Sequence, residues 1–423
     1  MKRLSIRVLG LVLLLAGAVR AQESTTKGPS IPVEEYGARR EKLQKAFEGT
    51  LVLIEADPLG KGMDAIDANT PVFDFVYLAG YHREGDFLAL DPEAGAVLFA
   101  DGKADKLKGV SGVAEVRPRN EFFTFVKKSL ARPKAPKAMT RLRKKAKEVV
   151  DALGKEEDAE VESAGSKIQK EISKLRMIKS APEIEMIRKA SDATNKAHLE
   201  VMKACKPGLN EKLLQKIIED KFKTEGCDGL GFPSIVGSGK NGVVLHYCEN
   251  TDVMPAGTLV VCDIGASYLG YVTDITRTLP TSGKFSDELK KAYQCVLDAQ
   301  KAAEAILKPG ATFRDLQAAA AKVFEERELE DWCYCHSKSG GPRHGLSHFV
   351  GLAVHDSGVY QAPFEPGVVI TIEPGYYNKE KGYGIRIEDM YVVTKDGFER
   401  LSSGAPREVD EVEAAMAGKK KNY

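Results

Sequence analysis

Apolar positions recur with a helical period in four stretches of the second half of the chain. They predict helices over residues 180–205 and 210–225, and again over residues 287–307 and 312–328. Ser180 begins the first stretch, and a proline and two glutamates follow it, which is typical of a helix N-terminus. We therefore expect two pairs of consecutive helices.

Strand-like runs rich in β-branched residues follow each predicted helix pair. They lie at residues 243–247, 258–265 and 271–279 after the first pair, and at 368–373 and 384–394 after the second. Lys-Pro-Gly separates the two helices in both pairs, at residues 206–208 and 308–310, so the pattern recurs after 102 residues. This recurrence predicts an internal duplication, with any shared site lying between the two halves.

Shorter and more mixed elements are predicted in the first part of the chain. A helical stretch at residues 36–48 precedes strand-like runs at 51–55, 73–78, 87–90 and 98–100. We expect an α+β protein. A smaller mixed α/β domain at residues 33–175 would precede a larger, duplicated ααββ-type domain at 176–405 and a C-terminal tail at 406–423.

Basic residues are dense over residues 127–148, but five acidic residues follow between positions 156 and 162. The opposite signs favour a solvated helical face near a domain linker over a nucleic-acid site. The whole chain of 423 residues has 62 Lys and Arg against 61 Asp and Glu, whereas a dedicated nucleic-acid binder carries a basic surplus. A charged content of 29% and a hydrophobic content of 43% also exclude a disordered chain, a collagen and a multispan membrane protein.

The N-terminus has the pattern of a secretory signal peptide. Three basic residues precede a 12-residue apolar run at 8–19, and small residues surround a junction after Ala21. The apolar run is shorter than the roughly 20 residues that span a bilayer. We expect cleavage after residue 21, a flexible lead-in at 22–32, no stable membrane span and export; an uncleaved anchor remains the alternative. Removing residues 1–21 leaves 58 basic against 61 acidic residues, a net charge of −3.

The seven cysteines do not form the pattern of a disulfide scaffold. Their odd number leaves at least one unpaired within a monomer, and their density is low. Cys333 and Cys335 flank one residue and could hold a metal or a strained disulfide, but no second such pair completes a zinc site. Scattered, buried small residues are the favoured interpretation.

The segment 237–242 matches the dinucleotide motif G-x-G-x-x-G only in its letters. The motif needs a strand before it and a helix after it, whose N-terminus meets the pyrophosphate. Here a strand-like run follows, so a glycine-rich turn is expected. The sequence also lacks the P-loop, H-E-x-x-H and G-x-S-x-G motifs, which removes support for nucleotide hydrolysis, zincin proteolysis and a serine-hydrolase site.

Four carboxylates lie in apolar, strand-like surroundings of the duplicated region, namely Asp263, Asp274, Glu373 and Glu388. Burying an acidic side chain is costly unless it is paired or binds a metal. Strands joined near residues 267–270 would bring the two aspartates onto one face. Arg386 could neutralise a neighbouring acid by an ion pair, which is the alternative for any one carboxylate.

A histidine-rich segment adds to these acids. His344, His348 and His355 fall within 12 residues, which favours a metal or acid–base site over three structural histidines. Four ionised carboxylates balance two divalent cations. Oxygen-rich ligation with one imidazole favours Mn²⁺ over a sulfur-bound zinc, and Co²⁺ or Zn²⁺ remain alternatives. Two such ions can lower the pKa of a bridging water and polarise a carbonyl.

The order Asp, Asp, His, Glu, Glu with these flanking residues resembles the dinuclear pita-bread metallopeptidases over residues 180–400. The resemblance implies that the metal ligands are Asp263, Asp274, His348, Glu373 and Glu388. It also implies that Asp274 and Glu388 bridge or nearly bridge two ions, and that Glu373 acts as the general base on the nucleophilic water.

The flanks of His348 and His355 are most similar to the aminopeptidase P and prolidase branch. This branch implies catalytic roles for His355, as a proton shuttle, and for His246, near the scissile bond. It implies a substrate pocket lined by His344, Tyr377 and Arg386. It also implies an N-terminal α/β domain, and residues 75–81 resemble the characteristic strand and turn of that domain.

The implied function is metal-dependent hydrolysis of the Xaa-Pro bond at the free N-terminus of peptides that carry proline at the second position. Proline has no amide N–H and a fixed φ, so a pocket shaped for its ring can select it. An Xaa-Pro dipeptidase and a pita-bread binding module that has lost catalysis are the alternatives. Members of this branch often form dimers or tetramers, so self-association is expected.

Overall fold

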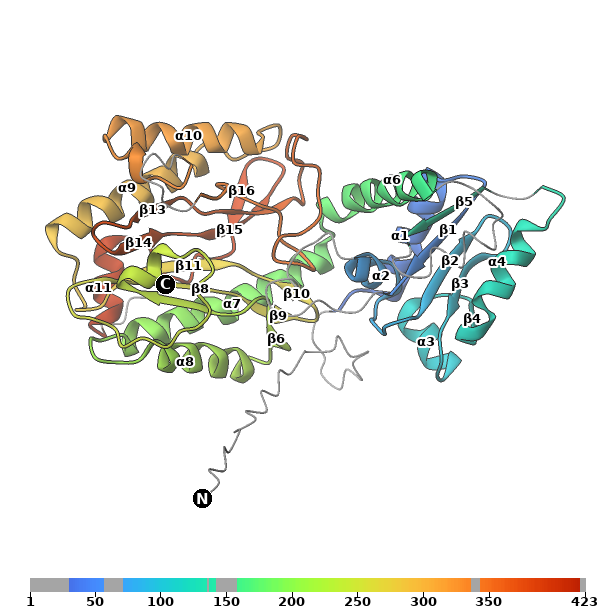
Figure 1. Ribbon diagram of the computed structural model, residues 1–423, viewed down its shortest axis with the longest axis horizontal. Helices are drawn as coiled ribbons and strands as arrows, with labels where there is room; N and C mark the ends of the chain where they lie inside the picture. Colours follow the sequence, from blue (N-terminus) through green and yellow to red (C-terminus); the bar gives the residue numbers. More distant parts are fainter. Residues whose placement is uncertain (1–29, 57–70, 135–136, 142–157, 336–342, 419–423) are drawn as a thin grey trace, which may run out of the picture.

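The computed structural model describes residues 30–56, 71–134, 137–141, 158–335 and 343–418. The expected signal peptide and most of the expected lead-in lie outside these residues. Figure 1 shows a smaller N-terminal lobe and a larger C-terminal lobe. Within the described ranges, no helix is both long enough and apolar enough to cross a membrane.

The N-terminal lobe contains one mixed sheet with strand order β4-β3-β2-β1-β5. Its strands are β1 (Thr50–Glu55), β2 (Phe87–Asp91), β3 (Gly95–Phe99), β4 (Glu115–Arg117) and β5 (Lys137–Arg141). Its helices are α1 (Val33–Ala46), α2 (Pro71–Ala79), α3 (Ala104–Ser111), η2 (Arg119–Glu121), α4 (Phe122–Leu130) and α6 (Asp158–Met177). Strand β1 pairs antiparallel with β2 and parallel with β5.

Both faces of this sheet are buried, which explains the continuous apolar run of β1. Leu51 and Leu53 pack on one side with Phe122 of α4. Val52 and Ile54 pack on the other side with residues of α1, α2 and α6. The predicted mixed α/β character of this region is therefore confirmed.

The predicted strand at residues 73–78, and the strand and turn expected at 75–81, are wrong, because this segment forms helix α2. Phe75, Leu78 and their neighbours are buried on all sides, and periodicity does not distinguish a wholly buried helix from a buried strand. Gly80 ends the helix with a φ of 77°. The helical face expected at 127–148 is also wrong in part, because residues 137–141 form β5 beside β1.

The C-terminal lobe repeats a helix pair followed by antiparallel strands. Its helices are α7 (Ala181–Ala204), α8 (Glu211–Thr224), η3 (Gly239–Val243), α9 (Asp287–Glu304), α10 (Phe313–Glu326), η4 (Glu330–Trp332) and α11 (Val409–Met416). The strands associated with the first pair are β6 (Gly229–Leu230), β7 (Ile235–Ser238), β8 (Leu259–Ile264), β9 (Ala266–Tyr268), β10 (Tyr271–Val272) and β11 (Ile275–Pro280). Those after the second pair are β12 (Val369–Ile372), β13 (Gly375–Asn378), β14 (Tyr383–Arg386), β15 (Asp389–Val393) and β16 (Phe398–Arg400).

The two halves share their local geometry as well as their order of elements. Three-stranded sheets β11-β8-β7 and β12-β15-β16 follow the respective helix pairs. Gly208 and Gly310, which end the two Lys-Pro-Gly segments, have φ values of 83° and 90°. Glycine adopts this left-handed conformation without the steric cost that other residues bear. The predicted recurrence is therefore present in the structure.

The strand predicted at residues 243–247 is wrong. The chain instead forms the 3-10 helix η3 and an irregular loop, whose polar groups are satisfied by the buried carboxylate of Glu211. Glu211 accepts hydrogen bonds from Ser238, Asn241 and Tyr247. The glycine-rich turn expected at 237–242 is also wrong in part, because its first two residues belong to strand β7. Only a five-residue 3-10 helix follows that strand.

Capping fixes where α7 begins. Ser180 and Glu183 form a reciprocal capping box, in which each side chain accepts a hydrogen bond from the backbone N–H of the other residue. Such a cap stabilises a helix by about 1 kcal/mol. The first helix of the larger lobe therefore has a well-defined start, only a few residues after α6 ends at Met177.

Candidate metal centre

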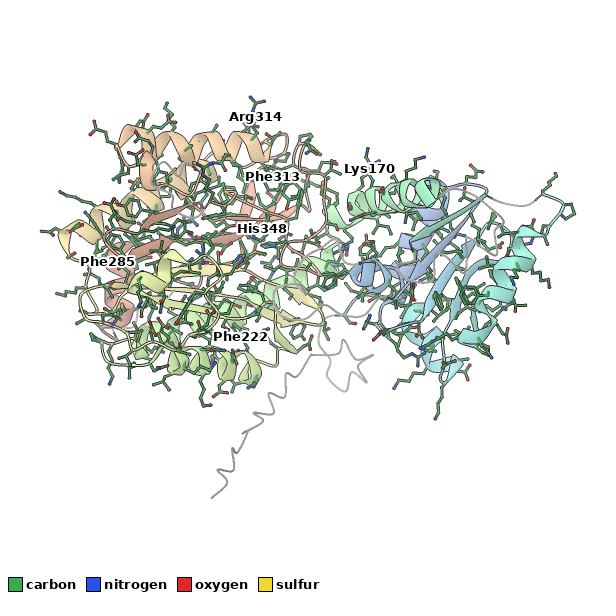
Figure 2. All side chains as sticks on the ribbon, viewed as in Figure 1. Lys170, Phe222, Phe285, Phe313, Arg314 and His348 are labelled. Atoms are coloured by element: carbon green, nitrogen blue, oxygen red, sulfur yellow. The ribbon has the colours of Figure 1, made fainter. Side chains whose placement is uncertain are left out.

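The five candidate ligands meet in one cavity of about 310 Å³ in the C-terminal lobe. Asp263 lies in β8, Asp274 directly before β11, and Glu373 directly after β12. The other two are Glu388, between β14 and β15, and His348, in the loop before β12. His348 is labelled in Figure 2, deep within the strands of this lobe. Both halves of the duplication therefore supply side chains to the cavity.

The strands predicted at 271–279 and 384–394 are each interrupted at a carboxylate, so those predictions are wrong as single strands. The first breaks at Asp274, and the second breaks at Glu388. The backbone N–H of Glu388 donates to the carbonyl of Thr276 at 3.1 Å, so the two breaks lie against each other. Because the backbone leaves the β-ladder at these two points, the side chains of Asp274 and Glu388 can both reach the shared cavity.

Close packing of the backbone accompanies the aspartate pair. Asp263 of β8 pairs in antiparallel register with Thr276 of β11, which lies two residues after Asp274. A Cβ atom added to Gly265 would lie 1.9 Å from the carbonyl oxygen of Thr273. Only glycine allows this approach. The expectation that joined strands bring the aspartates together is therefore confirmed.

Hydrogen bonds to the backbone and ring of His348 fix the position of its imidazole. The His348 N–H donates to Thr371 Oγ1 at 3.2 Å, and its carbonyl accepts from the Thr371 N–H at 3.0 Å. Its Nδ1 lies 3.1 Å from the carbonyl of Phe349, which leaves Nε2 to face the acids. Such an outer hydrogen bond fixes the orientation of a metal-binding histidine.

The distances around His348 fit a compact ligand set. Its Nε2 lies 3.3 Å from Glu373 Oε1 and 3.5 Å from Asp274 Oδ2. Glu388 Oε1 is 3.9 Å away. One ligand atom each from Asp274, His348 and Glu388 lies within 4.8 Å of the others. These atoms could bind a single ion, and the remaining carboxylates are near enough to extend the site.

Unsatisfied oxygen atoms test whether a cation fits here. Asp263 Oδ1, Asp274 Oδ1 and Glu388 Oε1 are buried and accept no hydrogen bond. Buried acceptors of this kind are costly unless a donor or a cation occupies the space between them. The second oxygen of Glu388 accepts a hydrogen bond from Thr276 Oγ1 at 2.6 Å. The donor set therefore suits hard divalent cations, which prefer oxygen ligands.

The electrostatics of the acids lead to the same conclusion. Burial and the nearby Asp263 raise the pKa of the Asp274 carboxyl to about 7. Burial and Asp274 raise the pKa of Glu388 well above its usual range. These groups resist ionisation because negative charges are concentrated away from water. A divalent cation among them would reverse that effect.

His348 and Glu373 behave as a coupled pair. Burial alone would lower the pKa of His348, but its contacts with Asp274 and Glu373 raise it well above the usual value. Burial would raise the pKa of Glu373, and the contact with His348 nevertheless lowers it. Glu373 is therefore held in its ionised form, unlike Asp274 and Glu388, whose pKa values are raised.

One wall of the cavity is a hydrogen-bonded group of three side chains. The hydroxyl of Tyr377 lies 2.8 Å from His344 Nε2 and accepts a hydrogen bond from Arg386 at 2.9 Å. Arg386 also donates to Asp263 Oδ2 at 2.8 Å, so the ion pair considered as an alternative does form. It occupies one oxygen of Asp263 and leaves Oδ1 without a partner.

Tyr377 differs from the other candidates in its position. His344 and Arg386 line the cavity, whereas Tyr377 is 1% exposed and lies behind them. His344 Nδ1 lies 3.6 Å from Glu373 Oε2, which connects this wall to the ligands. Burial lowers the pKa of His344, so this ring is neutral near pH 7.

His246 and His355 also line the cavity, as expected. The His355 ring contacts the His348 ring with centroids 4.6 Å apart. Burial and the nearby His348 lower the pKa of His355 to about 4. His246 lies in the loop after η3 and is exposed. The catalytic roles of both histidines stay predictions.

Several side chains of the site were not among the residues predicted from the sequence. Arg343 lines the cavity next to His344, as do the apolar residues Phe232, Ile235, Leu245 and Val354. Proximity to a predicted site residue was a usable signal for Arg343, Leu245 and Val354. No local pattern marks Phe232 or Ile235, which enter through the packing of the strands.

The cysteine pair considered as a metal site or disulfide lies beside this wall. The Sγ atoms of Cys333 and Cys335 are 3.1 Å apart, without a disulfide. The ring of Tyr334, between them, contacts His344 with centroids 5.2 Å apart. Cys205, Cys262 and Cys295 are buried and form no disulfide, which agrees with the interpretation of the cysteines as small buried residues.

Similar proteins were found by sequence and by structure. The chain is 34% identical over 271 residues to Xaa-Pro aminopeptidase of Escherichia coli, an alignment covering 59% of this chain and 62% of that enzyme. It is 30% identical over 442 residues to Xaa-Pro aminopeptidase 1 of Streptomyces coelicolor, covering 93% of this chain and 89% of the relative. The first alignment thus spans less than two thirds of the relative.

The structure of Pseudomonas aeruginosa aminopeptidase PepP is similar, with a TM-score of 0.79 and 27% identity over 92% of this chain and 99% of that chain. This likeness confirms the expected architecture of an N-terminal domain followed by a pita-bread domain. The profile of metallopeptidase family M24 matches residues 185–395, which include all five candidate ligands. The chain therefore belongs to metallopeptidase family M24.

Proposed function

We propose that this protein is a metal-dependent aminopeptidase that removes the N-terminal residue from peptides with proline at the second position. The observation that carries the proposal is the set of four carboxylates that line one cavity with His348, three of them buried and each of these three with an oxygen atom that lacks any partner. The similarity to Xaa-Pro aminopeptidases supports the substrate class.

The proposed ligands of two divalent ions are Asp263, Asp274, His348, Glu373 and Glu388. When bound, such ions supply Lewis acidity and a nucleophilic water of lowered pKa. Mn²⁺ is the proposed metal, because the donor set is oxygen-rich with a single imidazole. Metal analysis of protein purified without added metal, followed by reactivation with Mn²⁺, Co²⁺ and Zn²⁺ separately, tests this choice.

The protein side chains have separate proposed tasks. Glu373, which is ionised and lies beside His348 and His344 in the cavity, accepts the proton of the attacking water. His355 and His246 hold or donate protons near the scissile bond. Arg386, fixed by Tyr377 and Asp263, orients the substrate.

The apolar lining supports selection of proline. Phe232, Ile235, Leu245 and Val354 provide surfaces on which a pyrrolidine ring can pack. The cavity also has no need to satisfy an amide N–H at the scissile bond, because proline lacks one. Comparing turnover of Ala-Pro-Ala and Ala-Ala-Ala tests this part, with higher kcat/KM for the proline peptide as the expected result.

A strict Xaa-Pro dipeptidase is the second candidate. Two guanidinium groups, those of Arg343 and Arg386, line the cavity and could recognise the free carboxylate of a dipeptide. The two functions differ in one comparison. An aminopeptidase hydrolyses both Ala-Pro and Ala-Pro-Ala or prefers the longer peptide, whereas a dipeptidase hydrolyses only Ala-Pro.

We also propose export after cleavage of residues 1–21, from the basic and apolar pattern of the leader alone. N-terminal sequencing of the protein from its native host is the test, and a mature chain that begins at Gln22 is the expected result. Self-association as a dimer or tetramer is likewise a proposal, which sedimentation of the mature chain tests.

Replacing a ligand tests the whole proposal. Glu388→Ala should lose both bound metal and peptide turnover, because it removes a buried carboxylate ligand while the other acids remain. A matched control is Glu399→Ala in β16, a partly exposed carboxylate paired with Arg188 outside the cavity. Unchanged Xaa-Pro hydrolysis in Glu388→Ala would refute the proposal.

A further inference from the structure

Four charged side chains are buried together where the two lobes meet. Arg176 in the last turn of α6 contacts Asp74 of α2 with Nη1 and Oδ1 2.8 Å apart, and it also pairs with Asp356. Lys179 Nζ lies 3.2 Å from Asp356 Oδ2. None of the four is more than 4% exposed. This cluster therefore joins α2 of the N-terminal lobe to the segment that directly follows His355.

Asp356 closes a short loop of the metal centre. Its backbone N–H donates to the carbonyl of Phe349 at 2.8 Å. The loop at residues 349–356 thus begins next to His348 and ends next to His355, and the two imidazole rings contact each other. Any movement of the Asp356 backbone would displace both ends of this loop.

The loop has little room to adopt another arrangement. A Cβ atom on Gly351 would lie 2.2 Å from Asp356 Oδ2, so the backbone packs directly on the carboxylate. The Gly351 carbonyl accepts a hydrogen bond from the N–H of Val272 at 2.9 Å, two residues before Asp274. The same loop is therefore fixed to the ion cluster on one side and, on the other, to β10, which ends two residues before the candidate ligand Asp274.

Stabilisation of the folded state does not by itself explain why these four charges are buried together. A buried ion pair contributes little net stability compared with well-packed apolar side chains, because both charges must be removed from water. Its geometry is nevertheless specific, since a guanidinium places its donors in a fixed fork. Here that fork binds Asp74 on one lobe and Asp356 beside the site.

We propose that Asp356, Arg176 and Asp74 are positioning residues that hold His355 against the metal centre, and that the N-terminal lobe thereby takes part in catalysis. None of these three residues lines the cavity, so they act through the loop. The kinetic part of this inference rests on the proposed function, whereas the structural coupling does not.

Kinetics of three variants test the catalytic part. Asp356→Asn should lower kcat on Ala-Pro-Ala by about 10- to 100-fold, the effect of displacing an active-site group by roughly 1 Å. The KM and the metal content should stay within about twofold of the parent values. Asp74→Asn should lower kcat less, and the double variant should be no worse than Asp356→Asn, because both changes act through one loop.

Asp86→Asn is the matched control. Asp86 is also fully buried and ion-paired, but its partners Arg83 and Arg119 lie within the N-terminal lobe. This variant should keep the parent kcat. Equal losses of kcat in Asp74→Asn and Asp86→Asn would reduce the cluster to a general structural role and overturn the proposal.

Hydrogen exchange tests the coupling without any substrate. In the metal-loaded protein, amides of residues 349–356 should exchange faster in Asp74→Asn than in the parent or in Asp86→Asn. Parent-like exchange and kcat in both Asp74→Asn and Asp356→Asn would overturn the proposal.

If Asp356→Asn does not fold, Arg176→Lys replaces it in both assays. Lysine keeps the positive charge but lacks the forked guanidinium that binds Asp74 and Asp356 together. A parent enzyme without Xaa-Pro turnover would refute the proposed function, while hydrogen exchange still decides the coupling.

Discussion

Replacing Asp274 by Asn should change stability in opposite directions with and without metal. The Asp274 side chain is buried, and its pKa is raised to about 7 by burial and by Asp263. In the unfolded chain an aspartate titrates near 3.9. Because the folded pKa is the higher one, the associated stability is present below pH 4 and is lost as pH rises through 7.

The size of the effect follows from the difference between the two pKa values. Three pKa units correspond to a cost on the order of 4 kcal/mol at pH 8, of which about 2 kcal/mol develops between pH 5.5 and 8. The amide introduced by Asp274→Asn does not ionise. The metal-free variant should therefore be more stable than the metal-free parent at pH 8, and the difference should shrink by about 2 kcal/mol at pH 5.5.

Metal should reverse the order. Two ions, each at 100 times its Kd, stabilise the folded parent by about 5 kcal/mol, which exceeds the cost of about 4 kcal/mol at pH 8, whereas the variant lacks a ligand oxygen and binds them more weakly. The assay is urea denaturation with EDTA or Mn²⁺ at pH 5.5 and pH 8. A metal-free variant less stable than the parent at pH 8, or equal stabilisation of both proteins by Mn²⁺, would refute the reasoning.

Three further substitutions, the last with a matched control, have defined outcomes. Tyr377→Phe should lower kcat/KM by roughly 10- to 100-fold and leave the metal content unchanged, because it removes hydrogen bonds to two cavity side chains; parent-like kinetics would contradict this. Burial lowers the pKa of His198 to about 3, below its unfolded value near 6.5, so the stability that this histidine contributes is present above pH 6.5 and is lost as pH falls. The free energy of unfolding of the parent should therefore fall by about 3 kcal/mol between pH 7 and pH 4.5 through this group. His198→Asn should not show this part of the fall in urea denaturation. Gly265→Ala should destabilise the protein and weaken Mn²⁺ binding, whereas Gly109→Ala, in an open helical position, should be neutral or stabilising by up to about 1 kcal/mol.

Local signals were sufficient to predict much of the C-terminal lobe. The helices over 180–225 and 287–328 follow from a clear apolar period and from capping residues such as Ser180 and Thr312. The candidate ligands could be predicted because an acid inside an apolar run has few low-energy explanations. The packing of the two halves then places these acids in one cavity.

Local signals failed where tertiary contacts decide the conformation. Helix α2 is buried on all sides by β1, α1, α3 and α6. Residues 243–247 do not form a strand, because the distant carboxylate of Glu211 accepts hydrogen bonds from this loop. The strand breaks at Asp274 and Glu388 face each other, although 114 positions separate them in the sequence. The ion cluster of Asp74, Arg176 and Asp356 is equally invisible to a local pattern.

Asp263, Asp274, Glu388, the half-buried Glu373 and His348 are proposed to form a metal centre that hydrolyses Xaa-Pro bonds. The most direct test measures bound metal and turnover of Ala-Pro-Ala on the same samples of the parent and of Glu388→Ala. The account predicts two divalent ions per chain and turnover for the parent, with both lost together in the variant. A parent that hydrolyses the peptide without any divalent metal, or a variant that retains full turnover, would contradict it.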